Sequence, residues 1–246
     1  MITVYGRKTA LEALRDPTLH CATLHLARSN RGGGIVGELR AAAAQRGVSV
    51  QEHSREALAR ISRNGRQDQG VALDVRCPHI DELDEFLARE RPKAVTLLAF
   101  DGVTNPQNMG MALRSAVAAG VDGVLYADRG NPALGPLVIK ASAGTVFRAP
   151  LLRCADVASA ARACIDAGFS LYRLRAGGAR QLFAGDFAAH SLFVLGGETD
   201  GVSEEVCELQ GEDLAIPMSG GVESLNVAVS AALVAYAAGR QGYFAR

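Results

Sequence analysis

Residues 94–127, which read AVTLLAFDGVTNPQNMGMALRSAVAAGVDGVLYA, decide the fold of this chain. The apolar runs 94–100 and 121–126 are typical of strands that are buried on both faces of a sheet. Between them, residues 109–119 have the length and composition of a helix. A strand, a helix and a second strand in this order predict a parallel βαβ unit whose helix covers the sheet.

The alternation of strands and helices continues to the end of the chain. We expect further strands at residues 149–152, 170–173, 191–195 and 214–216, and further helices at residues 137–143, 157–167, 203–209 and 225–238. The sequence therefore predicts an α/β domain with a mainly parallel sheet over residues 94–246. Ligands of such sheets bind beyond the carboxyl ends of the strands, so chemistry is expected in the loops that follow the strands.

Residues 1–75 show the same alternation in a smaller domain. We expect helices at residues 3–16, 35–46 and 55–61, and strands at residues 20–27, 48–52 and 70–75. Residues 76–93 contain Pro78, an acidic helical stretch at 81–91 and Pro92, a composition typical of a linker. The predicted organisation is a small α/β domain, a linker and a larger α/β domain.

Charge is balanced over the whole chain but not along it. The 246 residues include 26 Lys and Arg and 26 Asp and Glu, which excludes a uniformly cationic surface for a polyanion. Residues 1–75 carry 11 basic and 7 acidic residues, whereas residues 94–246 carry 11 and 14. An N-terminal domain that contacts nucleic acid shows this asymmetry, and so do many ordinary solvated surfaces.

The cysteines and the N-terminal stretch indicate the compartment. The five cysteines form no CxxC pair and no cluster with His at metal-ligand spacing, so we expect reduced thiols and no metal site. The stretch MITVYGRKTALEAL lacks the apolar core of a signal peptide, and no apolar run reaches the length of a membrane span. We therefore expect a cytoplasmic protein.

Polar side chains gather in the loop after the strand at 94–100. Asn105 and Pro106 favour a turn, Asn108 is a candidate cap of the next helix, and Arg114 follows it by six positions. Six positions turn a helix by about 600°, so Asn108 and Arg114 share a face only if Asn108 lies outside the helix. Taken alone, this segment is better explained as a capped helix with a surface arginine.

The loop after the strand at 191–195 is rich in glycine. Gly196 and Gly197 allow a ligand to approach the backbone, and Glu198 is either a functional carboxylate or a solvated loop residue. Ser203 can begin a helix whose N-terminus favours negative charge. The glycine spacing matches neither the GxGxxG nor the P-loop fingerprint, which argues against a nucleotide-dependent enzyme of those kinds.

The loop before the last helix combines proline, glycine and polar residues. Pro217 fixes the exit from the preceding strand, and the glycines at 220 and 221 let the loop fold back. Ser224 is the expected N-cap of the last helix, a role that can coexist with a functional one. Asn226 falls in the first turn, where helix propensity does not explain an asparagine.

Together these loops resemble the signature motifs of the SpoU (TrmH) family of SPOUT RNA 2′-O-methyltransferases. The segments NPQNMGMALRSAVAAGVDGV, FVLGGETDGVSEEV and LAIPMSGGVESLNVAVSAALV resemble the family's three motifs in their usual order, and IKASAG its middle segment. Residues 4–8 and 67–72 are similar to the ends of the L30e-like RNA-binding domain found in the ribosomal-RNA-modifying branch. The resemblance covers residues 94–246 closely and residues 1–75 more loosely.

The resemblance implies a fold, a cofactor and a set of site residues. It implies a SPOUT domain with a C-terminal trefoil knot, a homodimer, and S-adenosyl-L-methionine as methyl donor. The implied donor-binding residues are Gly196, Ile216 and Leu225, with Leu195, Gly197, Pro217 and Met218 nearby. The implied catalytic residues are Asn108, Arg114, Glu198, Ser224 and Asn226. Thr199 departs from the family's second motif, where a glycine is commoner, and restricts that loop position.

The implied reaction is methyl transfer to a ribose 2′-hydroxyl of structured RNA. The family's usual mechanism assigns proton removal to Arg114, but a guanidinium is always protonated, so we expect it to bind phosphate and the developing oxyanion. The expected RNA contacts in the N-terminal domain are Arg7, Lys8, Arg28, Arg31, Arg63 and Arg66, each of which can equally serve solubility. The expected substrate is a guanosine of 23S rRNA, with tRNA or a non-catalytic RNA-binding role as alternatives.

Overall fold

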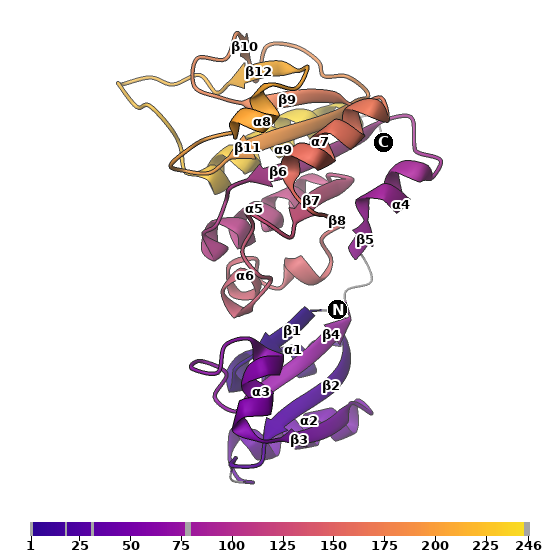
Figure 1. The fold of residues 1–246 in the computed structure, drawn as a ribbon, viewed down its shortest axis with the longest axis vertical. Helices are drawn as coiled ribbons and strands as arrows, with labels where there is room; N and C mark the ends of the chain where they lie inside the picture. Colours follow the sequence, from indigo (N-terminus) through magenta and orange to yellow (C-terminus); the bar gives the residue numbers. More distant parts are fainter. Residues whose placement is uncertain (1, 18, 31, 77–79, 244–246) are drawn as a thin grey trace. The chain divides into compact units, whose positions relative to one another are not determined.

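The computed structural model describes residues 2–17, 19–30, 32–76 and 80–243. The chain divides into an N-terminal unit, Met1–Pro78 with Leu134–Ile139, and a C-terminal unit, His79–Ala133 with Lys140–Arg246. Each unit has its own sheet, which can be followed in Figure 1.

The N-terminal unit is a four-stranded sheet with helices on both faces. Its elements are β1 (Ile2–Tyr5), α1 (Arg7–Arg15), β2 (His20–Ala27), α2 (Ile35–Gln45), β3 (Ser49–His53), α3 (Arg55–Ser62) and β4 (Val71–Arg76). The strand order is β1-β4-β2-β3, with β2 and β3 parallel and the other pairs antiparallel. The single helix expected at 3–16 is wrong at its start, because Gly6 adopts a φ of 93° and residues 2–5 pair with β4.

The larger sheet has eight strands in the order β10-β12-β9-β11-β6-β7-β8-β5, and every pair is parallel. From β5 onward the elements are β5 (Ile80–Glu82), α4 (Leu83–Ala88), β6 (Val95–Asp101), α5 (Pro106–Ala119), β7 (Gly123–Ala127), α6 (Pro136–Ala141), η1 (Thr145–Phe147), β8 (Leu151–Cys154), α7 (Val157–Asp166), β9 (Ser170–Leu174), β10 (Arg180–Gln181), β11 (His190–Gly196), α8 (Glu204–Cys207), β12 (Glu212–Ala215) and α9 (Val227–Tyr243). The predicted α/β class with a mainly parallel sheet is confirmed. The implied knot stays a prediction.

Part of the expected linker belongs to the larger sheet. Within residues 76–93, the acidic stretch begins as β5, which pairs in parallel with β8, and continues as the short helix α4. Leu83 of α4 is buried in the core of the C-terminal unit. The sequence does not predict β5 because three residues, Ile80-Asp81-Glu82, are too short and too polar to give a strand pattern.

Alternate residues of the central strands face two helical layers. Leu97 and Ala99 of β6 pack with Leu192 and Val194 of β11 in a core that α4, α7 and α8 cover. Their neighbours Leu98 and Phe100 point to the opposite face, which α5 and α9 cover. This burial on both faces explains the continuous apolar runs of the sequence.

A buried arginine fixes the segment between α8 and β12. The Arg173 side chain is only 9% exposed, and its Nε donates to Asp213 Oδ1 at 2.6 Å. Its two terminal nitrogens donate to four backbone carbonyls, those of Val206, Cys207, Leu209 and Gly211. One guanidinium therefore supplies the hydrogen-bond donors for the backbone carbonyls at the end of α8 and in the turn that leads into β12.

Replacing Arg173 with methionine should destabilise the C-terminal unit strongly. The variant leaves four carbonyls without their donor and leaves Asp213 with Arg175 as its remaining partner, which costs about 3–5 kcal/mol as for a broken buried ion pair. Urea unfolding followed by circular dichroism measures this loss. Arg162→Met, at an exposed position of α7, is the matched control and should change the stability by less than about 0.5 kcal/mol. An equal loss in the two variants would contradict the role of Arg173.

The cysteines of the described residues are free thiols. Burial is the main cause that raises the pKa of Cys154 and Cys164, each to about 12. Both therefore stay protonated and unreactive at neutral pH. Cys77 lies outside the described residues. Among the helices that the structure describes, none is long and apolar enough to cross a bilayer.

Candidate functional site

Four neighbouring strands of the larger sheet end beside one another. In the order β12-β9-β11-β6 they end at Ala215, Leu174, Gly196 and Asp101. Because all four are parallel, the loops that follow them leave from the same edge of the sheet. This edge is where a parallel sheet holds its ligands.

A cavity of about 800 Å³ opens at this edge. It is lined by all seven residues expected at the donor site, namely Leu195, Gly196, Gly197, Ile216, Pro217, Met218 and Leu225. Glu198, Ser224 and Asn226 line it as well. Loops separated along the chain thus form one cavity with apolar walls and a few polar groups, which is the usual composition of a small-molecule site.

The loop after β9 also lines this cavity, and it was not among the loops expected to carry chemistry. The loop residues that line it are Arg175, Ala176, Gly177 and Gly178, and the flanking strands add Leu174 of β9 and Gln181 of β10. Gly178 packs so closely on β12 that a Cβ there would lie 2.6 Å from the carbonyl carbon of Leu214. Gly177 has a φ of 73° and open space around it. The paired glycines after an apolar strand were the signal that could have identified this loop.

Three of the expected polar residues form one hydrogen-bond network. The Nδ2 of Asn108 donates to Glu198 Oε1 at 2.6 Å. The Nδ2 of Asn226 lies 3.1 Å from both Glu198 Oε1 and Asn108 Oδ1. Asn108 is only 5% exposed, so its amide is held rigidly. The network ties the helix after β6, the loop after β11 and the start of α9 to one another.

Two helix caps differ from the expected ones. Asn105 caps α5, because its side chain accepts from the backbone N–H of Gln107 and Asn108, and Asn108 lies inside the first turn. Asn226 caps α9, because its Oδ1 accepts from Ala228 N at 2.9 Å. Ser224 is therefore not the cap. It is exposed and lines the cavity, and its hydroxyl has no hydrogen bond to any described residue.

Arg114 does not join the other polar residues. Since Asn108 is helical, the two side chains leave α5 in directions about 120° apart, and the expectation that a cap position would bring them together is wrong. Arg114 is exposed and lines neither described cavity.

The loop after β11 is held tightly beside β6. A Cβ on Gly196 would overlap the backbone of Gly201 and Val202, and one on Gly197 would lie 2.5 Å from the carbonyl oxygen of Gly102. The N–H of Ser203 donates to Asp101 Oδ2 at 2.7 Å. Only glycine fits at positions 196 and 197. Thr199, in contrast, is exposed and is accommodated without a close contact of this kind.

The expected RNA contacts lie at the start of α1 and on the loops after β2 and α3. Arg7 donates from Nε to the backbone oxygen of Gln69 and from Nη2 to Asn30 Oδ1, which joins the start of α1 to two loops. Exposed side chains around these loops are Lys8, Arg28, Arg63 and Arg66. Arg31 lies outside the described residues. Within the described part of the chain, no group of three or more His, Cys, Asp and Glu is arranged to hold a metal ion.

Comparison with known proteins identifies both parts of the chain. Residues 95–236 match the SpoU rRNA Methylase family, and residues 3–79 match a domain described as RNA 2′-O ribose methyltransferase substrate binding. A Mycolicibacterium vanbaalenii protein, described as an uncharacterized tRNA/rRNA methyltransferase, is 32% identical over 97% of this chain and 76% of its own length.

Two solved structures have a similar fold. The AdoMet-bound rRNA methyltransferase of Sinorhizobium meliloti has a TM-score of 0.68 and 23% identity, covering 98% of this chain and 87% of its own. A Porphyromonas gingivalis protein of the TrmH family, described as a putative RNA methyltransferase, has a TM-score of 0.66 and 26% identity, covering 98% of this chain and 90% of its own. The chain therefore belongs to the SpoU rRNA methylase family of RNA methyltransferases.

Proposed function

We propose that this protein transfers a methyl group from S-adenosylmethionine to a ribose 2′-hydroxyl of ribosomal RNA. The observation that carries the proposal is the meeting of Gly196, Ile216 and Leu225 around one cavity beside the Asn108, Glu198 and Asn226 network. The match of the N-terminal unit to a 2′-O ribose methyltransferase substrate-binding domain supports the ribose position.

The residues of the cavity fit the proposed donor. Its volume of about 800 Å³ is within the range of sites that hold a ligand of this size. Leu195, Ile216 and Leu225 would hold the apolar parts of the donor, and the glycine-rich loops would offer backbone N–H and C=O groups to its polar parts. The similar Sinorhizobium meliloti methyltransferase has AdoMet bound.

The chain's own residues would act mainly by positioning. When bound, the donor supplies an electrophilic methyl group on a sulfonium, and an oxygen nucleophile must be held in line behind it. Asn108 and Asn226 hold the Glu198 carboxylate and so fix the loop after β11. The exposed Ser224 hydroxyl, which lines the cavity, would orient the ribose. Arg114 would bind the adjacent phosphate and the developing oxyanion.

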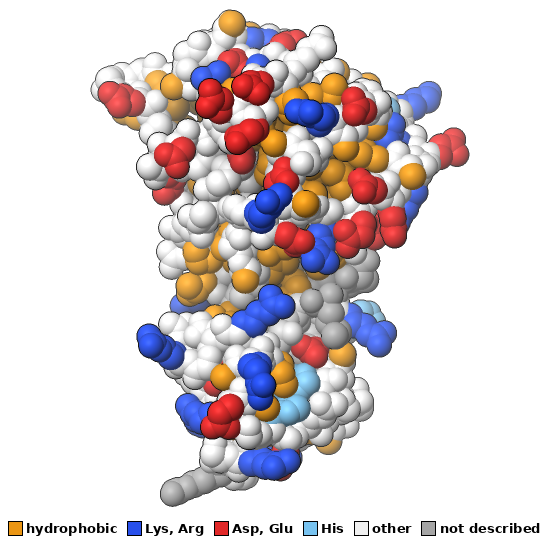
Figure 2. All heavy atoms as spheres, in the orientation of Figure 1, with side chains coloured by type: hydrophobic (Ala, Val, Ile, Leu, Met, Phe, Trp, Pro, Cys, Tyr) orange, Lys and Arg blue, Asp and Glu red, His pale blue; other side chains and the backbone are white. Residues whose placement is uncertain are grey.

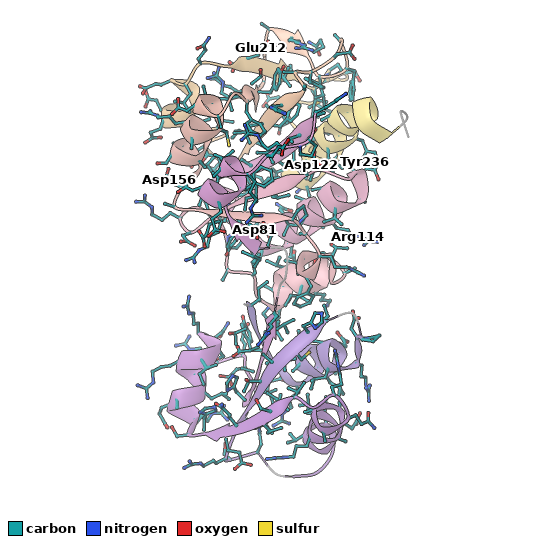
Figure 3. The ribbon with its side chains drawn as sticks, turned by 90° about the vertical axis from the view of Figure 1, so that its right-hand side faces the viewer. Asp81, Arg114, Asp122, Asp156, Glu212 and Tyr236 are labelled. Carbon is teal, nitrogen blue, oxygen red and sulfur yellow. The ribbon has the colours of Figure 1, made fainter. Side chains whose placement is uncertain are left out.

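We propose that Arg114 reaches the cavity of a second copy of the chain in a homodimer. The outer face of α9 is apolar at Val229 and Tyr236, which are 49% and 56% exposed, and Met111 of α5 is 42% exposed. Exposed apolar residues on two packed helices indicate an interface. Figure 3 shows Arg114 on the same side of the molecule as Tyr236. An interface on this side would place Arg114 at the boundary between two copies.

The N-terminal unit supports an RNA substrate. The start of α1 and the loops after β2 and α3 carry five cations, Arg7, Lys8, Arg28, Arg63 and Arg66, which suit the phosphates of a folded RNA. Arg63 and Gln69 adopt φ values of 53° and 52°, a backbone strain that functional loops often carry. We favour a guanosine of 23S rRNA, methylated in the cytoplasm, over tRNA.

Mapping the product tests the proposal directly. The protein and S-adenosylmethionine are incubated in one reaction with unmodified 23S rRNA and in a second reaction with unmodified total tRNA. Each RNA is then digested, and its nucleosides are analysed by mass spectrometry. We expect 2′-O-methylguanosine in the rRNA sample alone. A methylated base, or methylation of tRNA alone, would overturn the ribose position or the rRNA preference. If neither RNA is methylated, calorimetry of S-adenosylmethionine binding without RNA shows whether the protein fails to bind the donor or binds it and uses another RNA.

A further inference from the structure

Charge is divided between the two helical layers of the C-terminal unit. The layer that holds α4, α7 and α8 carries five helical carboxylates, those of Asp84, Glu85, Asp166, Glu204 and Glu205. Figure 2 shows acidic side chains gathered over α8. On the other layer, α5 and the part of α9 whose side chains are described contain no carboxylate, and Arg114 is their only charged residue.

A second cationic element lies beside α5. Residues 140–148, called the turn below, run from the last residues of α6 through η1, which packs against α5. The turn carries the exposed side chains Lys140, at the end of α6, and Arg148, directly after η1. Ala143, in the middle of the turn, adopts a φ of 50°, which is strained for a residue with a Cβ. The sequence contains no Asp or Glu between residues 129 and 155. The turn therefore presents positive charge without acidic neighbours in the chain.

These cations are unpaired, whereas most other described arginines of the C-terminal unit are paired. Neither Lys140, Arg148 nor Arg114 has an ion pair or hydrogen bond from its side chain to any residue that the structure describes. By contrast, carboxylates pair with Arg129, Arg153, Arg173, Arg175 and Arg180 of the same unit. Residues 94–246 have 11 basic and 14 acidic residues, so the unpaired cations do not come from a general excess of positive charge.

We propose that Lys140 and Arg148 bind phosphates of the RNA strand that carries the target ribose, next to Arg114. The inference rests on the proposed function, which brings that strand to Arg114. Exposed, unpaired ammonium and guanidinium groups in a region without carboxylates attract a polyanion and match phosphate oxygens. The turn would therefore hold the substrate strand on the C-terminal unit, separately from the contacts of the N-terminal unit.

Salt-dependent RNA binding tests the proposal with a matched control. The double variant Lys140→Gln/Arg148→Gln is compared with Arg162→Gln, which removes an exposed cation from α7 in the acidic layer. Binding of a 23S rRNA transcript is measured by filter retention at several salt concentrations. We expect the double variant to bind about tenfold to a hundredfold more weakly at low salt, with a salt slope reduced by about 1.4 for two lost phosphate contacts. The control should bind like the native protein.

Further variants and measurements separate phosphate binding by the turn from a structural role of the turn. Lys140→Arg/Arg148→Lys should retain the affinity, because charge and not shape is required, and donor affinity by calorimetry should be unchanged in every variant. Equal weakening by Arg162→Gln, or native RNA binding by the double variant, would overturn the proposal. The proposal would also be overturned if the double variant bound RNA normally but no longer self-associated in a sedimentation experiment. The turn would then be assigned to the contact between two copies of the chain. Methylation of rRNA by the native protein is measured in parallel, and it tests the proposed function independently of the turn.

Discussion

Replacing Arg114 with alanine is expected to reduce methyl transfer by about a hundredfold to a thousandfold, as loss of an oxyanion-stabilising donor does. The donor affinity should stay at the native value, because Arg114 lines neither cavity of its own chain. The variant should also fold normally, since the side chain is exposed and has no hydrogen bond to a described residue. Single-turnover transfer of a labelled methyl group and calorimetry of donor binding measure the two effects. Loss of both together would contradict this division of roles.

Mixed dimers decide which copy supplies the arginine. Arg114→Ala copies are mixed with copies that carry Gly196→Ala, whose cavity is expected to be blocked but whose Arg114 is intact. If the arginine acts across the dimer, random mixing restores about a quarter of the native activity, because half of the dimers are mixed and each has one complete site. If it acts within one chain, no mixed dimer has a complete site and activity stays absent. Arg114→Lys tests whether charge alone suffices.

More of the fold than of the site could be predicted from the sequence. The strands β6 and β11 are buried on both faces, and their continuous apolar runs predict a parallel sheet directly. Short polar elements gave no such pattern. β5 has three residues and β10 has two, and each is a strand only because the neighbouring strand supplies its hydrogen bonds. That pairing is a tertiary property, which local periodicity does not contain.

The local sequence pattern predicts which loops form the site, but it does not predict the directions in which their side chains point. Asn108 and Asn105 are both good caps, and only the backbone shows that Asn105 accepts the N–H groups at the start of α5. That shift of three residues turns Asn108 toward Glu198 and leaves Arg114 on the other side of the helix. Asn226, which helix propensity did not explain, is both the cap of α9 and a donor to Glu198.

Replacing Gly196 with alanine is expected to abolish donor binding, because the new methyl group would overlap the backbone of Gly201 and Val202. Backbone atoms cannot move aside as the end of a flexible side chain can, so the loop after β11 must leave its place against β6. The end of β11 and that loop supply Leu195, Gly196, Gly197 and Glu198 to the cavity wall. We expect calorimetry to detect an affinity at least about a hundredfold weaker.

Two further variants separate loop geometry from general instability. Thr199→Ala changes an exposed residue of the same loop, so donor affinity and stability should both match the native protein. Leu225→Ala removes an apolar wall of the cavity from a loop position that is 37% exposed, so the protein should fold normally and bind the donor about tenfold more weakly. Circular dichroism and urea unfolding show whether Gly196→Ala is folded. Native donor affinity in Gly196→Ala would mean that the cavity between these loops is not the donor site, and with it the assignment of Ile216 and Leu225 would fall.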